Sequence, residues 1–398
     1  IVTKLYNGIK LLLEKENGGN ASSNKNNEKS RLMSEFFKKD EVTICVTDVG
    51  LGGMSVLSEI EQRLRETPLF PKVKLLYYNA AVKPGYTQRP VAQQISIFNS
   101  ALLGMATYKP DIIFIACNTL SVIFAETEYA KTCAIPVMSI VDFGVNLFAE
   151  KMLADPSSVA LIFGTDTTAN VAAHRTALAK RGVAPERVIM KGCPKLATNI
   201  QGKGAESPEA DALLSKFVHE AWEVMAVGGT SGGLTADKGL TPVSAVYAGM
   251  CCTHYGYSLP LWNKALATEA SSGLGGLDTS VHTSCINPNS DMAGYIFAKS
   301  SRPLSGSGCT VTVEVLSKVA LVAEVESIAP LLSGPAGDGL RAYQNKVDLF
   351  DNELIQLPES EWFPPKQDDA VEGGSRDSSA KRSKDKKPES KKPRGSSS

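Results

Sequence analysis

The chain has 398 residues, of which 43% are hydrophobic and 21% are charged. This length and composition are typical of a globular protein with roughly two domains, and they exclude a chain that is disordered throughout. Lys and Arg together number 42, as do Asp and Glu, so the formal net charge is zero and nothing global points to nucleic acid or to an anionic membrane. The apolar runs are strand-sized, far short of the ~18 residues that span a bilayer.

The first third of the globular part alternates between strand and helix patterns. A short amphipathic helix is expected at 4–16, before a linker rich in Asn, Ser, Gly and Lys. Runs of β-branched and other apolar residues then predict buried strands at 41–48, 72–80, 111–119 and 135–142. Helical spacing predicts helices at 54–66, 89–108 and 121–132.

The same alternation restarts further along the chain. Strands are predicted at 158–164, 187–193, 244–252 and 310–315. Helices are predicted at 167–182, 194–200 and 211–226. Because continuous apolar strands alternate with helices, we expect an α/β protein with two similar doubly wound domains and mainly parallel sheets. The predicted parts are an N-terminal segment 1–40, a first domain 41–143 plus 288–357, a second domain 144–287 and a disordered tail 364–398.

The tail and the cysteines bear on the location of the protein. From residue 376 onward there are nine basic and three acidic residues, which we interpret as a solubilising disordered tail. A nuclear import signal or an arm that engages RNA or another partner is the alternative. The eight cysteines are spread through apolar segments, as reduced thiols of a cytoplasmic protein would be. The sequence starts with Ile1, so we treat it as a fragment or a processed chain.

Two cysteines stand at the carboxyl ends of predicted strands, Cys117 in the first half and Cys252 in the second. Two polar residues follow each of them, namely Asn118, Thr119, Thr253 and His254. In doubly wound sheets this edge is where ligands bind. A single buried cysteine most often only packs. A matched pair with polar neighbours indicates a site.

Such a pair can invert a carbon centre, because a thiolate on one face removes a proton and a thiol on the other face returns one. This chemistry requires one thiol with a pKa below the usual ~8.5. Asp48, which ends the first predicted strand, and His254 are expected to shuttle protons. The backbone N–H groups of Gly50, Gly52 and Gly53 are expected to hold a substrate carboxylate.

These residues carry a family resemblance. "TDVGLGGMSVL" at 47–57 resembles the glycine-rich opening motif of the glutamate racemases. "IACNT" and "CCTHYGYS" are similar to their two catalytic cysteine motifs, and "IPVMSIVDFG" and "KGCPKLA" resemble further segments in the expected order. The resemblance covers about residues 42–300 and extends to the cofactor-independent aspartate/glutamate racemase superfamily.

The resemblance implies two α/β domains with the active site between them. It implies that Cys117 and Cys252 are the acid/base thiols and that Asp48 and His254 assist them. The implied substrate-binding residues are Val49, Gly50, Asn118, Thr119 and Thr253. It implies a small amino-acid or dicarboxylate substrate and no pyridoxal phosphate, metal or nucleotide. We expect no nucleic acid in the core and no membrane, and a homodimer is the candidate assembly.

Departures from the family keep other functions open. Val49 replaces a serine that contacts substrate, Pro84-Gly85-Tyr86 replaces Pro-Tyr-Gly, and Cys251 replaces a glycine. One alternative is a same-fold enzyme for another small acid, of the hydantoin racemase or maleate isomerase type. Because both cysteines are present, a single-cysteine decarboxylase is disfavoured. The other alternative is a racemase-like binding protein without activity.

Simpler interpretations apply to several other residues. Adjacent Cys251 and Cys252 make a poor zinc site with His254, and "GLGGMS" is a weak dinucleotide motif. Cys251 is expected to pack on the face opposite Cys252. The remaining cysteines are expected in the core, with a binding role at Cys193 as the alternative: Cys45, Cys133, Cys193, Cys285 and Cys309. The other histidines are expected at the surface or on helix faces: His174, His219 and His282.

Overall fold

The computed structural model describes residues 30–227, 243–273, 281–300, 306, 308–332 and 334–351. The amphipathic segment at 4–16 and the basic tail at 364–398 lie outside these residues. Within the described residues, none of the helices combines the length and the apolar character that crossing a bilayer requires.

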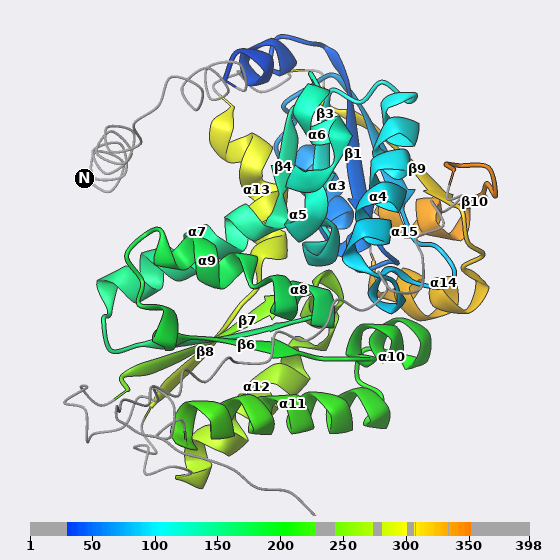
Figure 1. The fold of residues 1–398 in the computed structure, drawn as a ribbon. Coiled ribbons are helices and arrows are strands. Elements are labelled where there is room, and N and C mark those ends of the chain that lie inside the picture. Colours follow the sequence, from blue (N-terminus) through cyan, green and yellow to red (C-terminus); the bar gives the residue numbers. More distant parts are fainter. Residues whose placement is uncertain are drawn as a thin grey trace, which may run out of the picture.

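The first sheet has six parallel strands in the order β10-β9-β2-β1-β3-β4. The strands are β1 (Glu41–Asp48), β2 (Lys72–Asn79), β3 (Ile112–Ile115), β4 (Val137–Ser139), β9 (Thr310–Ser317) and β10 (Gln344–Asn345). The last five residues of both β1 and β2 are buried, because helices cover the two faces of the sheet. The segment that forms β9 therefore returns from late in the chain to pair with β2 (Figure 1).

Helices pack on both faces of this sheet. One face contacts α3 (Met54–Glu66), α13 (Pro288–Lys299), α14 (Val322–Ile328) and α15 (Gly334–Arg341). The other face contacts α4 (Val91–Ala106), α5 (Asn118–Ile123) and α6 (Glu128–Thr132). Short 3-10 turns join several elements: η1 (Tyr86–Gln88), η2 (Phe124–Glu126), η3 (Pro185–Arg187), η5 (Thr253–Ser258) and η7 (Ala329–Leu331).

The second sheet has four parallel strands in the order β6-β5-β7-β8. They are β5 (Val159–Gly164), β6 (Val188–Gly192), β7 (Ala245–Cys251) and β8 (His282–Ile286). One face packs on α10 (Leu196–Lys203), α11 (Pro208–Val227) and α12 (Leu259–Ser272), and the other on α7 (Ile140–Ala154) and α9 (Ala173–Ala179). Helix α8 (Asp166–Val171) follows β5. Figure 1 shows the two sheets one above the other, with α7 between them.

The predicted α/β class with two parallel sheets is confirmed, while the residue boundaries of the two domains stay a prediction. Several predicted elements were wrong in extent. The strand expected at 135–142 ends at Ser139, because an apolar run of this length fits a helix as well as a strand and α7 begins at Ile140. The helix expected at 121–132 is divided among α5, η2 and α6. The helix expected at 167–182 breaks at Ala172, whose φ is 51°.

Candidate active site

Strand ends from both sheets meet at one carboxylate. Asp48 is the last residue of β1, Cys117 follows β3, and Cys252 follows β7. The hydroxyl of Thr253, next to Cys252, donates to Asp48 Oδ2 at 2.6 Å. Asp48 is 1% exposed, and each of the two cysteines is 7% exposed. The structure therefore brings the predicted acid/base residues of the two halves together in a closed, buried cluster.

The turn after β1 is held by residues of the neighbouring strand. The Gly50 N–H donates to Asn79 Oδ1 at 2.9 Å, and the Tyr77 hydroxyl donates to the Gly50 carbonyl at 2.7 Å. Gly50 has a φ of +100°, which only glycine adopts without strain. The Val49 N–H donates to Asp48 Oδ1 at 2.6 Å. In this closed state the N–H groups of Val49 and Gly50 are thus already bonded within the protein.

This turn lies directly against the second half of the molecule. The Leu51 N–H donates to Gln201 Oε1 of α10 at 2.7 Å, and the Tyr257 hydroxyl of η5 donates to the Leu51 carbonyl at 3.2 Å. At Gly52 a Cβ atom would be 2.2 Å from Thr253 Oγ1 and 2.7 Å from the backbone nitrogen of His254. The glycine is needed here because the two backbones approach so closely.

His254 is the base nearest to the second cysteine. Its Nδ1 atom is 3.7 Å from Cys252 Sγ, and its Nε2 atom is 2.7 Å from Gln201 Oε1. Burial lowers the pKa of the imidazole, although the nearby Asp48 carboxylate opposes this effect. His254 is therefore set up as a neutral base beside the Cys252 thiol.

The first cysteine begins α5 and adjoins polar groups without protein partners. Asn118 is 2% exposed, and neither its Nδ2 nor its Oδ1 has a hydrogen-bond partner among the described residues. The Thr119 hydroxyl is 2.8 Å from that of Thr165, which belongs to the second half. Buried amides are rarely left unpaired, so the side chain of Asn118 is available to a polar ligand beside Cys117.

The surroundings raise the pKa of both thiols. Burial raises the pKa of Cys252, and the Asp48 carboxylate raises it further. Burial also raises the pKa of Cys117, again with a contribution from Asp48, while backbone N–H groups of Leu120 and Val49 lower it. The expectation that one thiol has a depressed pKa is therefore wrong for this state, because it neglected how fully the closed site excludes water.

The neighbouring cysteines do not form a metal site in the structure. Cys251 packs in the cluster beneath α7 and α9, whereas Cys252 packs in the cluster beneath α11 and α12. This confirms that their side chains lie on opposite faces of β7, so they do not share an ion. Among the described residues, no group of three His, Cys, Asp or Glu side chains is arranged to hold a metal.

The other cysteines and histidines, which were expected to pack in the core or to lie at the surface, differ in how deeply they are buried. Cys45 and Cys193 are buried, and the Cys193 pKa is raised by burial to about 12, whereas three others are only half-buried: Cys133, Cys285 and Cys309. His174 lies on a helix, α9, as one of the two alternatives expected, but it is fully buried rather than at the surface. Its ring lies against α7, where a Cβ atom at Gly144 would make only an ordinary contact of 3.4 Å with His174 Nε2.

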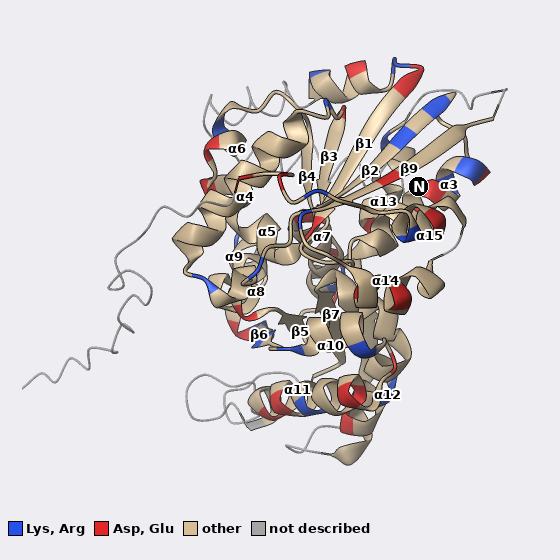
Figure 2. Ribbon diagram, turned by 90° about the vertical axis from the view of Figure 1, so that its right-hand side faces the viewer, with Lys and Arg blue, Asp and Glu red and all other residues tan. Residues whose placement is uncertain are grey.

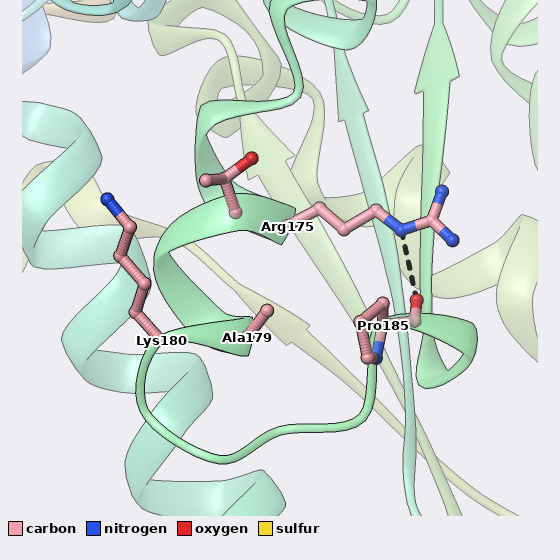
Figure 3. A pocket seen from close by; sticks show the side chains of 5 residues that line it. Arg175, Ala179, Lys180 and Pro185 are labelled. Atoms are coloured by element: carbon pink, nitrogen blue, oxygen red, sulfur yellow. Dashed lines mark hydrogen bonds between the residues drawn. The ribbon is translucent and has the colours of Figure 1, made fainter.

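Two open pockets lie away from the buried cluster. One lies beside α9 and η3, where Arg175 Nε donates to the Pro185 carbonyl at 3.0 Å. The side chain of Lys180 extends from the same helix in the direction opposite to Arg175 (Figure 3). The other lies between α3 and Tyr257 and is lined by Leu331 and Leu332. None of the predicted site residues lines either pocket. Figure 2 shows that Lys, Arg, Asp and Glu mark mainly the helices and loops around the sheets, as on α11.

Sequence reasoning missed the residues that support the cluster. Gln201, Asn79, Tyr77 and Tyr257 come from segments far apart in the chain, and only the fold brings them to the turn after β1. The segment "KGCPKLA" was noted for its resemblance, but Gln201 lies four residues after its end.

Comparison with known proteins finds glutamate racemases. The chain is 26% identical over 174 residues to the enzyme of Shouchella clausii, which covers 43% of this chain and 58% of the relative. It is 28% identical over 142 residues to that of Helicobacter acinonychis, covering 35% and 51%, and 22% identical over 228 residues to that of Gloeothece citriformis, covering 57% and 70%. The first two matches thus span little more than half of the relatives. No protein-family model matches the chain.

Solved structures show the same fold. A glutamate racemase of Bacillus anthracis superimposes with a TM-score of 0.54 at 16% identity, covering 74% of this chain and 94% of that one. The enzyme of Campylobacter jejuni gives 0.50 at 20% identity, covering 73% and 100%. That of Francisella tularensis, solved with D-glutamate, gives 0.51 at 15% identity, covering 77% and 98%. The similarity to the glutamate racemases that the motifs indicated is confirmed in sequence and in fold.

Proposed function

We propose that this chain, which shares its fold with the glutamate racemases, is an amino-acid racemase that inverts the α-carbon of a small acidic amino acid. The single observation that carries the proposal is the position of Asp48, which accepts a hydrogen bond from Thr253 and adjoins both strand-end cysteines. A buried carboxylate close to one strand-end cysteine from each half suits proton transfer on two faces of one carbon better than it suits packing.

The proposed reaction uses the thiols in opposite protonation states. Cys252 gives its proton to His254 Nδ1, and the resulting thiolate removes the α-proton of the substrate. Cys117 then donates its thiol proton to the opposite face of the carbanion, and the reverse reaction exchanges the two roles. Asn118, Thr119 and Thr253 are proposed to bind the substrate carboxylate and amino group. The unpaired amide of Asn118 supports this assignment.

The test is racemisation by single-cysteine variants, with a matched control in the neighbouring residue. Cys117→Ala and Cys252→Ala are each expected to lower the racemisation of D- and L-glutamate or aspartate by at least ~10³-fold, because each direction needs both thiols. Cys251→Ala is expected to keep activity within about twofold, because Cys251 lies on the opposite face of β7. Full activity in either of the first two variants would refute the proposal.

A substrate other than glutamate is the second candidate. The side chain of Val49 packs against the apolar cluster that contains Tyr86 and Leu120, so the residue after Asp48 offers no side-chain hydrogen bond to a substrate. We therefore include hydantoins and maleate beside the acidic amino acids in the substrate panel. Turnover of one of these compounds alone would assign the protein to that reaction.

Three further features stay predictions. They are a homodimer, a partner for the basic tail and a cytoplasmic location, and each is proposed on the sequence alone. Sedimentation of the full chain at several concentrations tests the first of them.

A further inference from the structure

One side-chain oxygen is shared by the two halves of the molecule. Gln201 Oε1 lies 2.7 Å from the Leu51 amide nitrogen and 2.7 Å from His254 Nε2. Leu51 belongs to the turn after β1, whereas Gln201 and His254 belong to the second half. Gly50 makes room for this oxygen, since a Cβ atom there would lie 2.4 Å from it.

This geometry determines which way the amide of Gln201 faces. A backbone N–H is only a donor, so the atom that meets Leu51 must be the carbonyl oxygen of the amide. The same oxygen is only an acceptor toward His254, so the Nε2 atom must carry the hydrogen. In a neutral imidazole the other nitrogen, Nδ1, is then the free acceptor, and Nδ1 is the atom that faces Cys252 Sγ at 3.7 Å.

We propose that Gln201 is a positioning residue that holds His254 in its Nε2–H tautomer, so that Nδ1 is ready to take the Cys252 proton. The inference rests on the proposed racemase function for its purpose, but not for its test. The proton moves from Cys252 Sγ to His254 Nδ1, which leaves a thiolate and an imidazolium with hydrogens on both nitrogens. Because Gln201 is neutral, it directs the proton without adding a charge.

The direct test is the tautomer itself. Long-range ¹H–¹⁵N correlation spectra of the full chain with ¹⁵N-labelled histidine resolve only four side chains. His174, His219 and His282 are assigned by their Gln variants, which leaves His254 by elimination. We expect His254 to be the Nε2–H tautomer near pH 8 in the wild-type protein. An Nδ1–H tautomer would overturn the proposal whether or not the protein racemises amino acids.

Two variants separate positioning from a merely structural role. Gln201→Glu keeps an acceptor oxygen, so the Nε2–H tautomer is expected to persist. Gln201→Leu removes the acceptor, so a mixture of tautomers is expected, and the Leu51 amide is expected to exchange its hydrogen about tenfold faster. Thr198→Ala, on an exposed position of the same helix, is the control and is expected to change neither. An unchanged tautomer in Gln201→Leu would refute the proposal.

Activity gives a second outcome that is independent of the spectra. If the racemase function holds, Gln201→Leu is expected to lower kcat at least tenfold with little change in KM, and Gln201→Glu to restore most of it. If the protein shows no racemisation but the tautomer behaves as expected, the proposed function fails and the positioning role of Gln201 stands. Equal loss of activity in both variants would contradict the role.

Discussion

Gly52 offers the sharpest test of how the two halves fit together. A Cβ atom at Gly52 would lie 2.2 Å from Thr253 Oγ1, 2.6 Å from His254 Nδ1 and 2.7 Å from the His254 backbone nitrogen. Ordinary contacts are roughly 3.5 Å, so Gly52→Ala requires a displacement of about 1 Å. Neither of these groups can move away easily, because the Thr253 hydroxyl is hydrogen-bonded to Asp48 and the His254 nitrogen belongs to the backbone.

The expected cost of Gly52→Ala is therefore about 1–3 kcal/mol of unfolding free energy, the usual range for overpacking. A shift of about 1 Å in groups that position a reacting centre lowers kcat/KM by about 10²-fold. Urea unfolding and a chiral assay on the same preparation measure the two effects. Gly202→Ala is the control, since a Cβ atom there would meet nothing within 4 Å and the helix α10 should gain about 0.5–1 kcal/mol. Wild-type stability and activity in Gly52→Ala would refute the packing argument.

Three further predictions concern buried groups. Thr253→Val removes the hydroxyl that donates to Asp48, so urea unfolding should show a loss of about 1.5–3 kcal/mol, and no loss would contradict a stabilising role for this hydrogen bond. Burial lowers the pKa of His174 in the folded protein to about 4. As the pH drops from ~6.5 toward 4, the unfolded protein therefore takes up a proton at His174 before the folded protein does, and the free energy of unfolding falls. His174→Leu should remove roughly 3 kcal/mol of this acid loss in unfolding curves at pH 7.5 and 4.5, and an equal loss in both proteins would refute the burial. Because burial raises the pKa of Cys117 and Cys252, both thiols should be alkylated slowly at neutral pH. The alkylation rate should rise about tenfold per pH unit, as the thiolate fraction does. Fast labelling at pH 7 would show that the buried arrangement of the two thiols is not the prevailing one.

The sequence was informative where structure depends on local pattern. The strand 41–48 and the helix 54–66 have the predicted bounds, because β-branched residues, a glycine turn and helical spacing follow one another directly. The two cysteine motifs were found because the carboxyl ends of parallel strands share an edge, a rule that needs only strand order.

The sequence was not informative where contacts join distant segments. Gln201 is separated by 150 residues from Leu51 and by 53 from His254, and no local sequence pattern predicts either contact. His174 resembles an exposed helix residue in the sequence, but α7 packs against α9 and buries it. The raised pKa values of the two thiols likewise depend on how tightly the two halves close, which spacing along the chain does not reveal.

The central claim is tested most directly by α-proton exchange. The purified protein is incubated in D2O with single enantiomers of glutamate and of aspartate, and the α-hydrogen signal and the optical rotation are followed together. The account predicts that one of these acids loses its α-hydrogen and its optical rotation from either enantiomer, because one thiolate removes the proton and the opposite thiol returns solvent deuterium. No exchange on any enantiomer, with the protein folded and both cysteines reduced, would contradict it.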